Sequence, residues 1–526
     1  MVLPGVAATP RIRDPRGSVM NEQLETSAPA LTPARPGSAA PWSRMQLLQV
    51  FGLLLLVALA LRLPGYVVDV FNTDETFLAT QAEVIKDGGN LYREAADRKP
   101  PLVPYIYAGT FTLFGTTALW SVRVMAAVAV ALTGLLVAAE ARARWGRRAG
   151  WLAGILLVLA TGAFVPQDGQ AANFEIFMLP PMTAAVLLAR RGRGFSSGVA
   201  VAVATLAKQT GAATLLPVLY LMWKHRGRRG AGDALLGFGA LIAAVALFVG
   251  PGQLLFWAVL GNGSYLSDGA ASFLVILLFA SMTLLFAALN LPIVWTLPQA
   301  WRERHTYGRG DVDLWLWLAS AALSVTVGFR FFGHYYLQLL PPLALLAAGV
   351  LARMSARLVK QTVALAASIA AVLVLLAFPD QPIEYPEYED AAEYVATHAG
   401  PDDQILVWGH VPEIYWASGA QPATRFLTNR FLTGSWAGRP EDTAADPEAA
   451  ATPGAWELFF QDLASHPPRY ILDAAPAGIR ESGSYPIDLF PRFDAIVSSQ
   501  YRRVTVIDGI TIYERVPQPT FEKTIW

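Results

Sequence analysis

The sequence predicts a polytopic α-helical membrane protein that carries a soluble α/β domain at its C-terminal end. Of its 526 residues, 54% are hydrophobic and only 15% are charged, whereas soluble domains contain about 25% charged residues. Several apolar runs approach the ~20 residues that a helix needs to cross a bilayer. The balance of 40 basic against 40 acidic residues excludes a basic nucleic-acid-binding protein. The absence of cysteine excludes thiolate catalysis and Cys-ligated metal sites.

The chain divides into three predicted parts. Residues 1–45 are rich in proline and lack apolar periodicity, which predicts a disordered cytoplasmic tail. Residues 46–378 form the transmembrane domain, with about eleven predicted helices. These helices lie at about 46–64, 121–140, 149–165, 174–189, 195–207, 210–223, 234–250, 272–298, 313–329, 335–352 and 359–378.

The positions of the positive charges predict the orientation in the membrane. The Arg-rich loops, such as 141–148 and 224–229, fall on the cytoplasmic side only if the apolar run 101–115 does not cross. As a helix, this run would reach about 22 Å, which is short of a ~30 Å hydrocarbon core. We therefore expect two interfacial helices, 74–88 and 101–115, in the first outer loop. The N-terminus is then cytoplasmic in a multi-pass protein of the plasma membrane.

The third part, residues 379–526, is predicted to be an extracytoplasmic α/β domain. Here the apolar runs shorten to strand length and alternate with helical patterns, which is typical of a small α/β fold. The stretch 436–454 has the composition of a loop. Strands are expected at 405–408, 469–472, 504–507 and 510–513, and helices at about 387–398, 412–418 and 455–465.

Three basic residues lie on the predicted outer side, against the general charge bias. Lys99, Lys208 and Arg330 come from separate loops but fall at the same depth, at the outer ends of helices. A charge at this boundary is costly unless it is paired or reaches water. For any one of these residues alone, a side chain that extends to water explains its position. Together they indicate a site for an anionic headgroup, such as a lipid phosphate.

The first outer loop also carries acidic residues near a predicted helix start. Asp74 and Glu75 stand in FNTDETF, where Thr73 or Asp74 could cap the helix or a carboxylate could act as general base on a hydroxyl. Asp97 precedes Lys99, and the two prolines that follow Lys99 hold it in a stiff elbow.

Other polar residues are expected near the same boundary. Glu175 opens a predicted helix in AANFEIF; it could bind a metal ion or a sugar hydroxyl, or be an ordinary interface residue. Asp168 is expected to be solvated. His334 and Tyr335 begin a later helix beside Arg330, where they could line a pocket, although a lone histidine is more often a structural hydrogen bonder. No cofactor is required by these motifs, and a divalent metal ion stays an open alternative.

These stretches resemble the GT-C class of integral-membrane glycosyltransferases. The branch concerned contains the lipid A aminoarabinose transferases, the protein O-mannosyltransferases and the lipopolysaccharide-core transferases. An Asp-Glu pair in the first outer loop, Lys-Pro-Pro some 25 residues later, and an acid opening the fourth span carry the resemblance. It covers about residues 60–350.

The resemblance implies a sugar donor linked to polyprenyl phosphate and transfer on the outer face of the membrane. It implies that Asp74 is the catalytic base and that Lys99 contacts the lipid phosphate. Glu75, Asp97, Glu175, Lys208, Arg330, His334 and Tyr335 complete the predicted substrate-binding set. The acceptor would be a hydroxyl of a cell-envelope lipid or glycan.

The sequence departs from the family at two places. Phe77 and Leu78 replace the Arg-Tyr of aminoarabinose transferases, and Arg98 replaces their Glu before Lys-Pro-Pro. These differences argue against lipid A as acceptor. The MIR domain of the eukaryotic protein mannosyltransferases is missing from this sequence, so the resemblance does not imply a protein acceptor. A transporter or flippase for a lipid-linked sugar is the alternative function, although it would normally show internal repeats that this sequence lacks. A non-catalytic scaffold is a further alternative.

Overall fold

The computed structural model describes residues 42–262, 273–304, 311–378, 387–435, 448 and 450–517. The predicted tail up to residue 41, the start of the predicted outer domain and most of the predicted loop 436–454 lie outside these residues.

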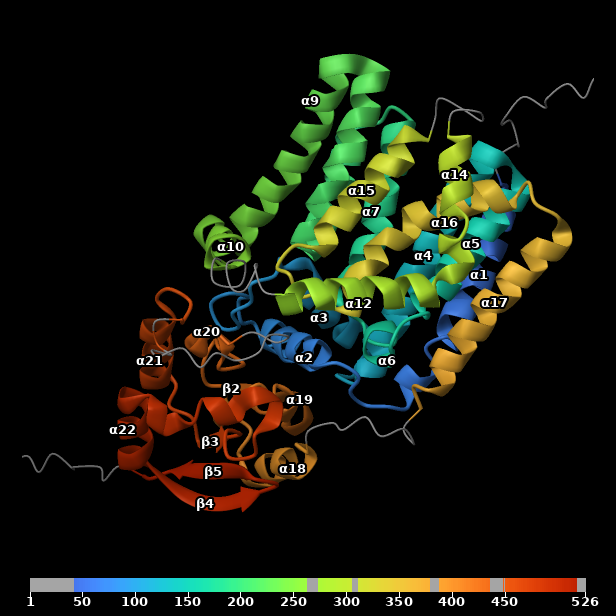
Figure 1. Ribbon diagram of the computed structural model, residues 1–526. Helices are drawn as coiled ribbons and strands as arrows, with labels where there is room; N and C mark the ends of the chain where they lie inside the picture. The colour runs from blue at the N-terminus through green and yellow to red at the C-terminus, as the bar shows by residue number, and fades with distance from the viewer. Residues whose placement is uncertain are drawn as a thin grey trace, which may run out of the picture. The chain divides into compact units, whose positions relative to one another are not determined.

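Each predicted apolar run coincides with helical structure (Figure 1). The run 210–223 begins in η2 (Gln209–Thr214) and continues into one long helix, α9, which also contains most of the run 234–250. Within α9, Gly227 has φ 58° and ψ −145°. Because glycine tolerates positive φ, α9 can be two helical segments joined at a kink. The long helices are α1 (Arg44–Ala60), α4 (Leu119–Trp145), α5 (Arg147–Thr161), α7 (Phe174–Arg190), α8 (Gly194–Ala207), α9 (Leu215–Val249), α12 (Phe273–Leu289), α15 (Val312–Val325), α16 (Leu340–Leu351) and α17 (Ala356–Leu375).

Some of these helical segments are long enough to cross a membrane by themselves. In the described part of the chain, four have at least 18 residues and sufficient hydropathy, and a fifth is added if the pair bent by 80° at residue 290 is one span. Four further apolar helices have 10–17 residues. The expected number of about eleven crossings therefore stays a prediction. The four long segments are Leu119–Trp145, Gln209–Val249, Gly333–Leu351 and Ala356–Leu375.

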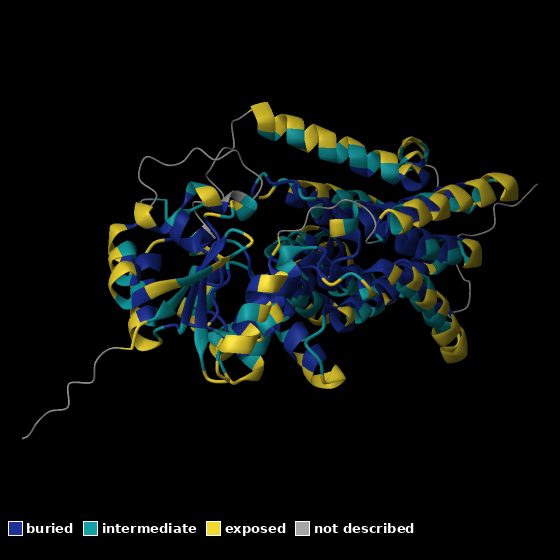
Figure 2. Ribbon diagram, turned by 90° about the horizontal axis from the view of Figure 1, so that it is seen from below, coloured by how far each residue is buried: buried dark blue, intermediate teal, exposed yellow. Residues whose placement is uncertain are grey.

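The helical part exposes large apolar side chains along its outer surface. In α9, Leu247 and Phe248 are 76% and 75% exposed, and in α12 Phe273 is 75% exposed. Figure 2 shows helices whose outward faces are exposed over much of their length. Extended apolar surfaces of this kind mark contact with a membrane or another protein, so this surface suits a lipid-facing role.

Both helices expected in the first loop are present. They are α2 (Thr73–Lys86) and α3 (Leu102–Phe114), and they pack against each other. Gly115 ends α3 with φ 65°, a conformation that favours glycine. The shorter elements of the helical part are η1 (Leu63–Tyr66), α6 (Pro166–Gly169), η2 (Gln209–Thr214), α10 (Pro251–Ala258), η3 (Leu260–Asn262), α13 (Leu291–Val294), α14 (Leu297–Glu303) and η4 (Gly333–Leu339).

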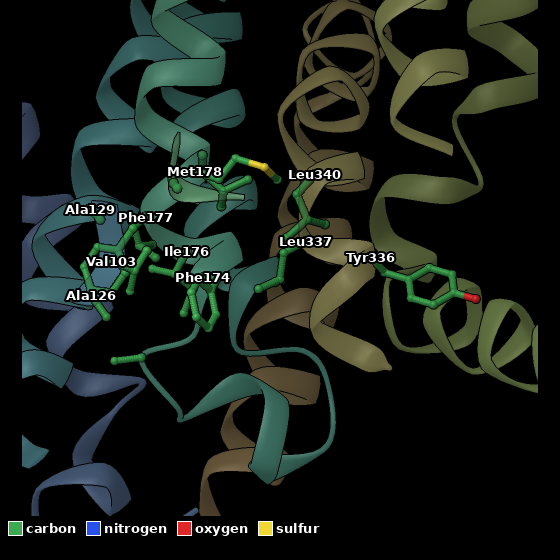
Figure 3. Packing of buried hydrophobic residues seen from close by; sticks show 14 of the residues in the cluster. Val103, Ala126, Ala129, Phe174, Ile176, Phe177, Met178, Tyr336, Leu337 and Leu340 are labelled. Carbon is green, nitrogen blue, oxygen red and sulfur yellow. The ribbon is translucent and has the colours of Figure 1, made fainter. Parts of the chain in front are cut away.

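Helix α7 is central to the packing that fixes the site. Phe174, Ile176 and Met178 are buried in one cluster with Leu337 and Leu340 of η4 and α16, and Figure 3 shows these side chains from close by. Tyr107 of α3 donates a hydrogen bond to the carbonyl of Ala172 at 2.7 Å. The first turn of α7 is therefore held from two sides.

The C-terminal part has α/β structure around a small mixed sheet, as predicted. Its five-stranded sheet has the order β2-β1-β3-β5-β4, in which β1 is parallel to β2 and β3 while β5 is antiparallel to β3 and β4. All four expected strands and all three expected helices are present; β2, α20, α22 and the short helices η5 and η6 were not expected. The elements are α18 (Glu389–His398), β1 (Gln404–Trp408), α19 (Glu413–Ser418), β2 (Gln421–Pro422), α20 (Arg430–Thr433), α21 (Ala455–Ser465), β3 (Tyr470–Asp473), η5 (Ile479–Ser484), η6 (Ile487–Leu489), α22 (Pro491–Gln500), β4 (Tyr501–Ile507) and β5 (Ile510–Arg515).

Hydrogen bonds join this domain to the first loop. The amide of Ala96 donates to the carbonyl of Arg425 at 2.7 Å, and Trp416 Nε1 donates to the carbonyl of Thr117 at 3.0 Å. Helix α19 packs against α2. These contacts bring the loop that contains Asp74 and Lys99 next to the α/β domain.

Candidate functional site

Asp74 stands in the first turn of α2, where a neighbouring residue supplies the cap. Asn72 Oδ1 accepts a hydrogen bond from the amide of Asp74 at 2.9 Å, so the expectation that Thr73 or Asp74 caps the helix is wrong. The cap leaves the Asp74 carboxylate available, and its Oδ2 lies 2.8 Å from Lys99 Nζ. The Asp74 side chain is 34% exposed, so solvent or a substrate can reach it.

This ion pair fixes the protonation state of Asp74. Burial by itself would raise the pKa of Asp74, but the charge and hydrogen bond of the Lys99 ammonium outweigh it and hold the pKa well below its usual range. Asp74 is therefore ionised at neutral pH, which is the state that a general base requires.

The Lys-Pro-Pro elbow is held by its own loop. Asp97 Oδ1 accepts a hydrogen bond from the amide of Lys99 at 3.1 Å, and Tyr92 donates its hydroxyl to the Lys99 carbonyl at 2.8 Å. The Lys99 ammonium also lies 3.9 Å from the ring centroid of Phe174, a favourable cation–π contact. The loop thus presents Lys99 at the start of α7. Burial raises the pKa of Asp97.

A second lysine–carboxylate pair lies on the neighbouring helices. Glu175, in the first turn of α7, pairs with Lys208 at the end of α8. Lys208 Nζ is 3.7 Å from the ring centroid of Tyr335. Lys99 and Lys208 therefore flank the same helix start, one over Phe174 and the other on Glu175.

His334 joins this cluster through a partner that the sequence reasoning placed in solvent. Its Nδ1 lies 2.5 Å from Asp168 Oδ1, and its Nε2 lies 3.9 Å from Glu175 Oε1. Asp168 is buried, so the expectation that it is solvated is wrong. A Cβ on Gly333 would lie 1.9 Å from the Phe164 ring and 2.3 Å from Asp168 Oδ2, so this close approach requires glycine.

Arg330 is buried at the end of the α15–η4 connection. The residues on either side, Phe329 and Phe331, have φ of 53° and 52°. Non-glycine residues rarely adopt this left-handed region, and such strained backbone concentrates at functional sites. The strain supports a special role for this segment.

Glu75 occupies a different environment from its neighbour Asp74. It is fully buried and forms two hydrogen bonds with Arg123, at 2.9 and 2.7 Å, while Oε1 also accepts from the amide of Ala172 at 2.8 Å. Arg123 further donates to the carbonyls of Gly65, Val68 and Asp69. Arg123 was not singled out from the sequence. The feature that could have identified it is its position, since it is a positive charge near the start of a helix on the predicted outer side.

The donor set of the site does not fit a divalent metal ion. Among the described residues, no three His, Asp or Glu side chains are grouped so that they could hold one. The carboxylates of Asp74 and Glu175 are each paired with a lysine ammonium group. The site is instead a cluster in which lysine ammonium groups alternate with carboxylates.

Comparison with known proteins shows which fold the chain shares. Residues 98–252 match the family described as dolichyl-phosphate-mannose-protein mannosyltransferase, and no curated protein matches the chain. ArnT from Cupriavidus metallidurans, solved in the apo state and bound to undecaprenyl phosphate, is 14% identical with a TM-score of 0.61; the match covers 90% of this chain and 99% of ArnT.

A second similar structure is the archaeal oligosaccharyltransferase AglB from Archaeoglobus fulgidus, in complex with an inhibitory peptide and a dolichol-phosphate. It is 13% identical with a TM-score of 0.50, and the match covers 90% of this chain and 74% of AglB. The chain therefore has the helical membrane fold of the GT-C glycosyltransferases, which confirms the resemblance seen in the sequence.

Proposed function

We propose that the protein is a glycosyltransferase that moves a sugar from a polyprenyl-phosphate donor to a hydroxyl of a cell-envelope lipid or glycan. The observation that carries this proposal is the Asp74–Lys99 pair at 2.8 Å, set beside the Glu175–Lys208 pair in a GT-C fold. The similar ArnT structure, which holds undecaprenyl phosphate, supports a lipid-phosphate donor. The transfer takes place on the outer face of the plasma membrane.

The reaction needs one base and one anion-stabilising group. The acceptor oxygen attacks the anomeric carbon opposite the phosphate, so the new C–O bond forms as the bond to the phosphate oxygen breaks and the configuration inverts. Asp74 takes the proton of the acceptor hydroxyl, and the bonding electron pair leaves with the phosphate. Asp74 suits the role because it is ionised and reachable.

The lysines stabilise the leaving phosphate. Lys99 exchanges its partner, Asp74, for a phosphate oxygen when the donor binds, and this exchange also restores the basicity of Asp74 because the nearby positive charge is shared. Lys208, assisted by Arg330, adds a second positive charge from the Glu175 side. Such preorganised charges are worth a factor of about 10² to 10³ in rate.

The remaining predicted residues either border the phosphate side or hold the groups that do. His334 links Asp168 to Glu175, and Tyr335 lies against Lys208, so both border the phosphate side. Asp97 positions the Lys99 amide. Glu75 contributes indirectly, because its bonds to Arg123 and Ala172 tie α2 to α4 and to the segment before α7.

The test is the release of polyprenyl phosphate. Purified wild-type protein and Asp74→Asn are incubated with a panel of undecaprenyl-phosphate sugars and an envelope extract of the source cells, and products are read by mass spectrometry. We expect release and a glycosylated product with the wild type alone. Equal release by both proteins would remove Asp74 as the base. Donor binding without any transfer by either would favour a transporter of lipid-linked sugars.

A further inference from the structure

The turn after β1 presents a histidine in a fixed conformation. Gly409 has φ 145°, and a Cβ there would lie 2.9 Å from Ala474 Cβ and 3.1 Å from Ser482 Oγ, so the turn requires glycine. The next residue, His410, donates its amide to Ser482 Oγ at 3.4 Å and accepts from Arg480 through its carbonyl at 2.9 Å. The turn follows the carboxyl end of a parallel strand, which is where α/β sheets bind ligands.

A second segment connects this turn to the residues before Lys99. The amide of Asn429 donates to the carbonyl of Gly409 at 3.1 Å, and the carbonyl of Arg425 accepts from the amide of Ala96 at 2.7 Å. The segment 425–429 therefore touches both the turn and the loop that ends in Lys99. Three stretches from distant parts of the sequence meet beside the site.

The surroundings of His410 keep its imidazole uncharged. Burial, followed by the charges of Arg430 and Arg480, lowers the pKa of His410 well below its usual value, while Asp74 raises this pKa and Arg98 lowers it. The imidazole is thus neutral at neutral pH, with one nitrogen that donates and one that accepts a hydrogen bond.

Three buried polar atoms in these stretches lack a hydrogen-bond partner among the described residues. They are His410 Nδ1, Asn429 Nδ2 and Asp97 Oδ2. Asn429 is 5% exposed and Asp97 is 3% exposed. Buried polar atoms are nearly always paired in folded proteins, so three unpaired ones on neighbouring segments indicate a ligand that supplies the missing bonds.

We propose that His410 and Asn429 bind the acceptor of the transfer reaction and that this acceptor is an uncharged, hydroxyl-rich group such as a sugar. The inference rests on the function proposed above. A neutral imidazole and a carboxamide both match hydroxyls, which donate and accept hydrogen bonds. The α/β domain is then the acceptor-binding part of the enzyme, and the acceptor hydroxyl reaches Asp74 from the side of the turn.

The experiment separates acceptor use from donor binding. Full-length wild type, His410→Ala, His410→Gln and Asn429→Ala are compared in lipid nanodiscs. Transfer is measured against dilutions of the envelope extract with the donor sugar that the wild type uses, and binding is measured with radiolabelled undecaprenyl phosphate. His466→Ala is the matched control, because His466 is an exposed histidine at the end of α21.

We expect about a tenfold lower kcat/KM for the acceptor in each alanine variant, the loss of one hydrogen bond, with undecaprenyl-phosphate binding unchanged. His410→Gln should retain more activity than His410→Ala, because it keeps a neutral donor and acceptor. Wild-type acceptor use in a folded His410→Ala variant would overturn the inference, even if Asn429→Ala fails to fold. Absence of transfer by the wild type would instead overturn the proposed function and, with it, this inference.

Discussion

The two ends of helix α4 each carry a group of buried charges, and the two groups are built differently. Near one end, Arg144 pairs with Glu140 at 2.7 Å, with Asp313 at 2.5 Å and with Asp311 at 3.4 Å. The Arg144 and Asp313 side chains are almost completely buried. Roughly 30 Å away by helix rise, the site beside Arg123 contains lysine pairs, and the Asp74 and Lys99 side chains there are partly exposed.

The difference reflects the chemistry of the two cations. The planar guanidinium binds carboxylates through several fixed hydrogen bonds, whereas the lysine ammonium is a mobile point charge on a flexible chain. Arg144 and Arg123 therefore hold helices together. For Lys99 and Lys208 we propose instead an exchange of the carboxylate partner for the donor phosphate. Two adjacent acidic residues show the same difference, since Glu75 pairs with an arginine and Asp74 pairs with a lysine.

The largest expected effect is a loss of transferase activity that occurs only when the charges at the Arg123 end of α4 are changed. Asp74→Asn should lower transfer by about 10² to 10⁴, the usual contribution of a general base, while the protein stays folded. Asp311→Asn, which alters an acid at the other end of α4, should retain near-wild-type turnover. Both are measured as initial rates of polyprenyl-phosphate release, and a similar loss in the two variants would contradict the division.

The next effect concerns stability. Arg123→Met leaves the buried Glu75 carboxylate without its partner, and breaking a buried pair of this kind typically costs about 3–5 kcal/mol. We expect a large fall in the thermal unfolding temperature. Lys99→Met provides the comparison, because its pair is partly exposed and should contribute less. Equal destabilisation by both would mean that the lysine pair is also structural.

The affinity for the lipid-phosphate donor should depend on the Asp74–Lys99 pair and not on the Arg144 group. Lys99→Ala should weaken binding of radiolabelled undecaprenyl phosphate by about tenfold or more, because a charge-assisted hydrogen bond is worth ~1.5–3 kcal/mol. Arg144→Lys should leave this binding unchanged. Unaltered affinity in Lys99→Ala would exclude a phosphate role for Lys99.

The smallest effect is a pH dependence. Because Lys99 holds the pKa of Asp74 below its ordinary value, the pair contributes stability at every pH above the unfolded value of about 4 and loses it as the pH falls toward the lower folded value. Thermal unfolding of wild type and Lys99→Ala should therefore differ by a constant amount from pH 7 to pH 5. The gap should narrow progressively as the pH falls below about 4, and a gap that stays constant there would point to packing instead of charge.

Much of the fold and part of the site could be predicted from local patterns. Apolar runs and strand-length segments are local patterns, so the helical regions and the four expected strands could be located from the sequence, whereas the boundaries between individual helices could not. The acid pair and the Lys-Pro-Pro elbow could be singled out because their residue types are unusual at a predicted membrane boundary. The roles assigned to Asp74 and Lys99 stay predictions until the variants are measured.

Only the tertiary structure decided which charges meet. His334 and Asp168 are 166 positions apart, and Arg123 and Glu75 are 48 apart; no local periodicity records such pairs. The structure also assigned the cap to Asn72 and brought Arg425 and Trp416 into contact with the first loop. Helices and strands form according to residues that are neighbours in the sequence. These contacts instead depend on how the core packs, because packing decides which ends of helices and strands come together.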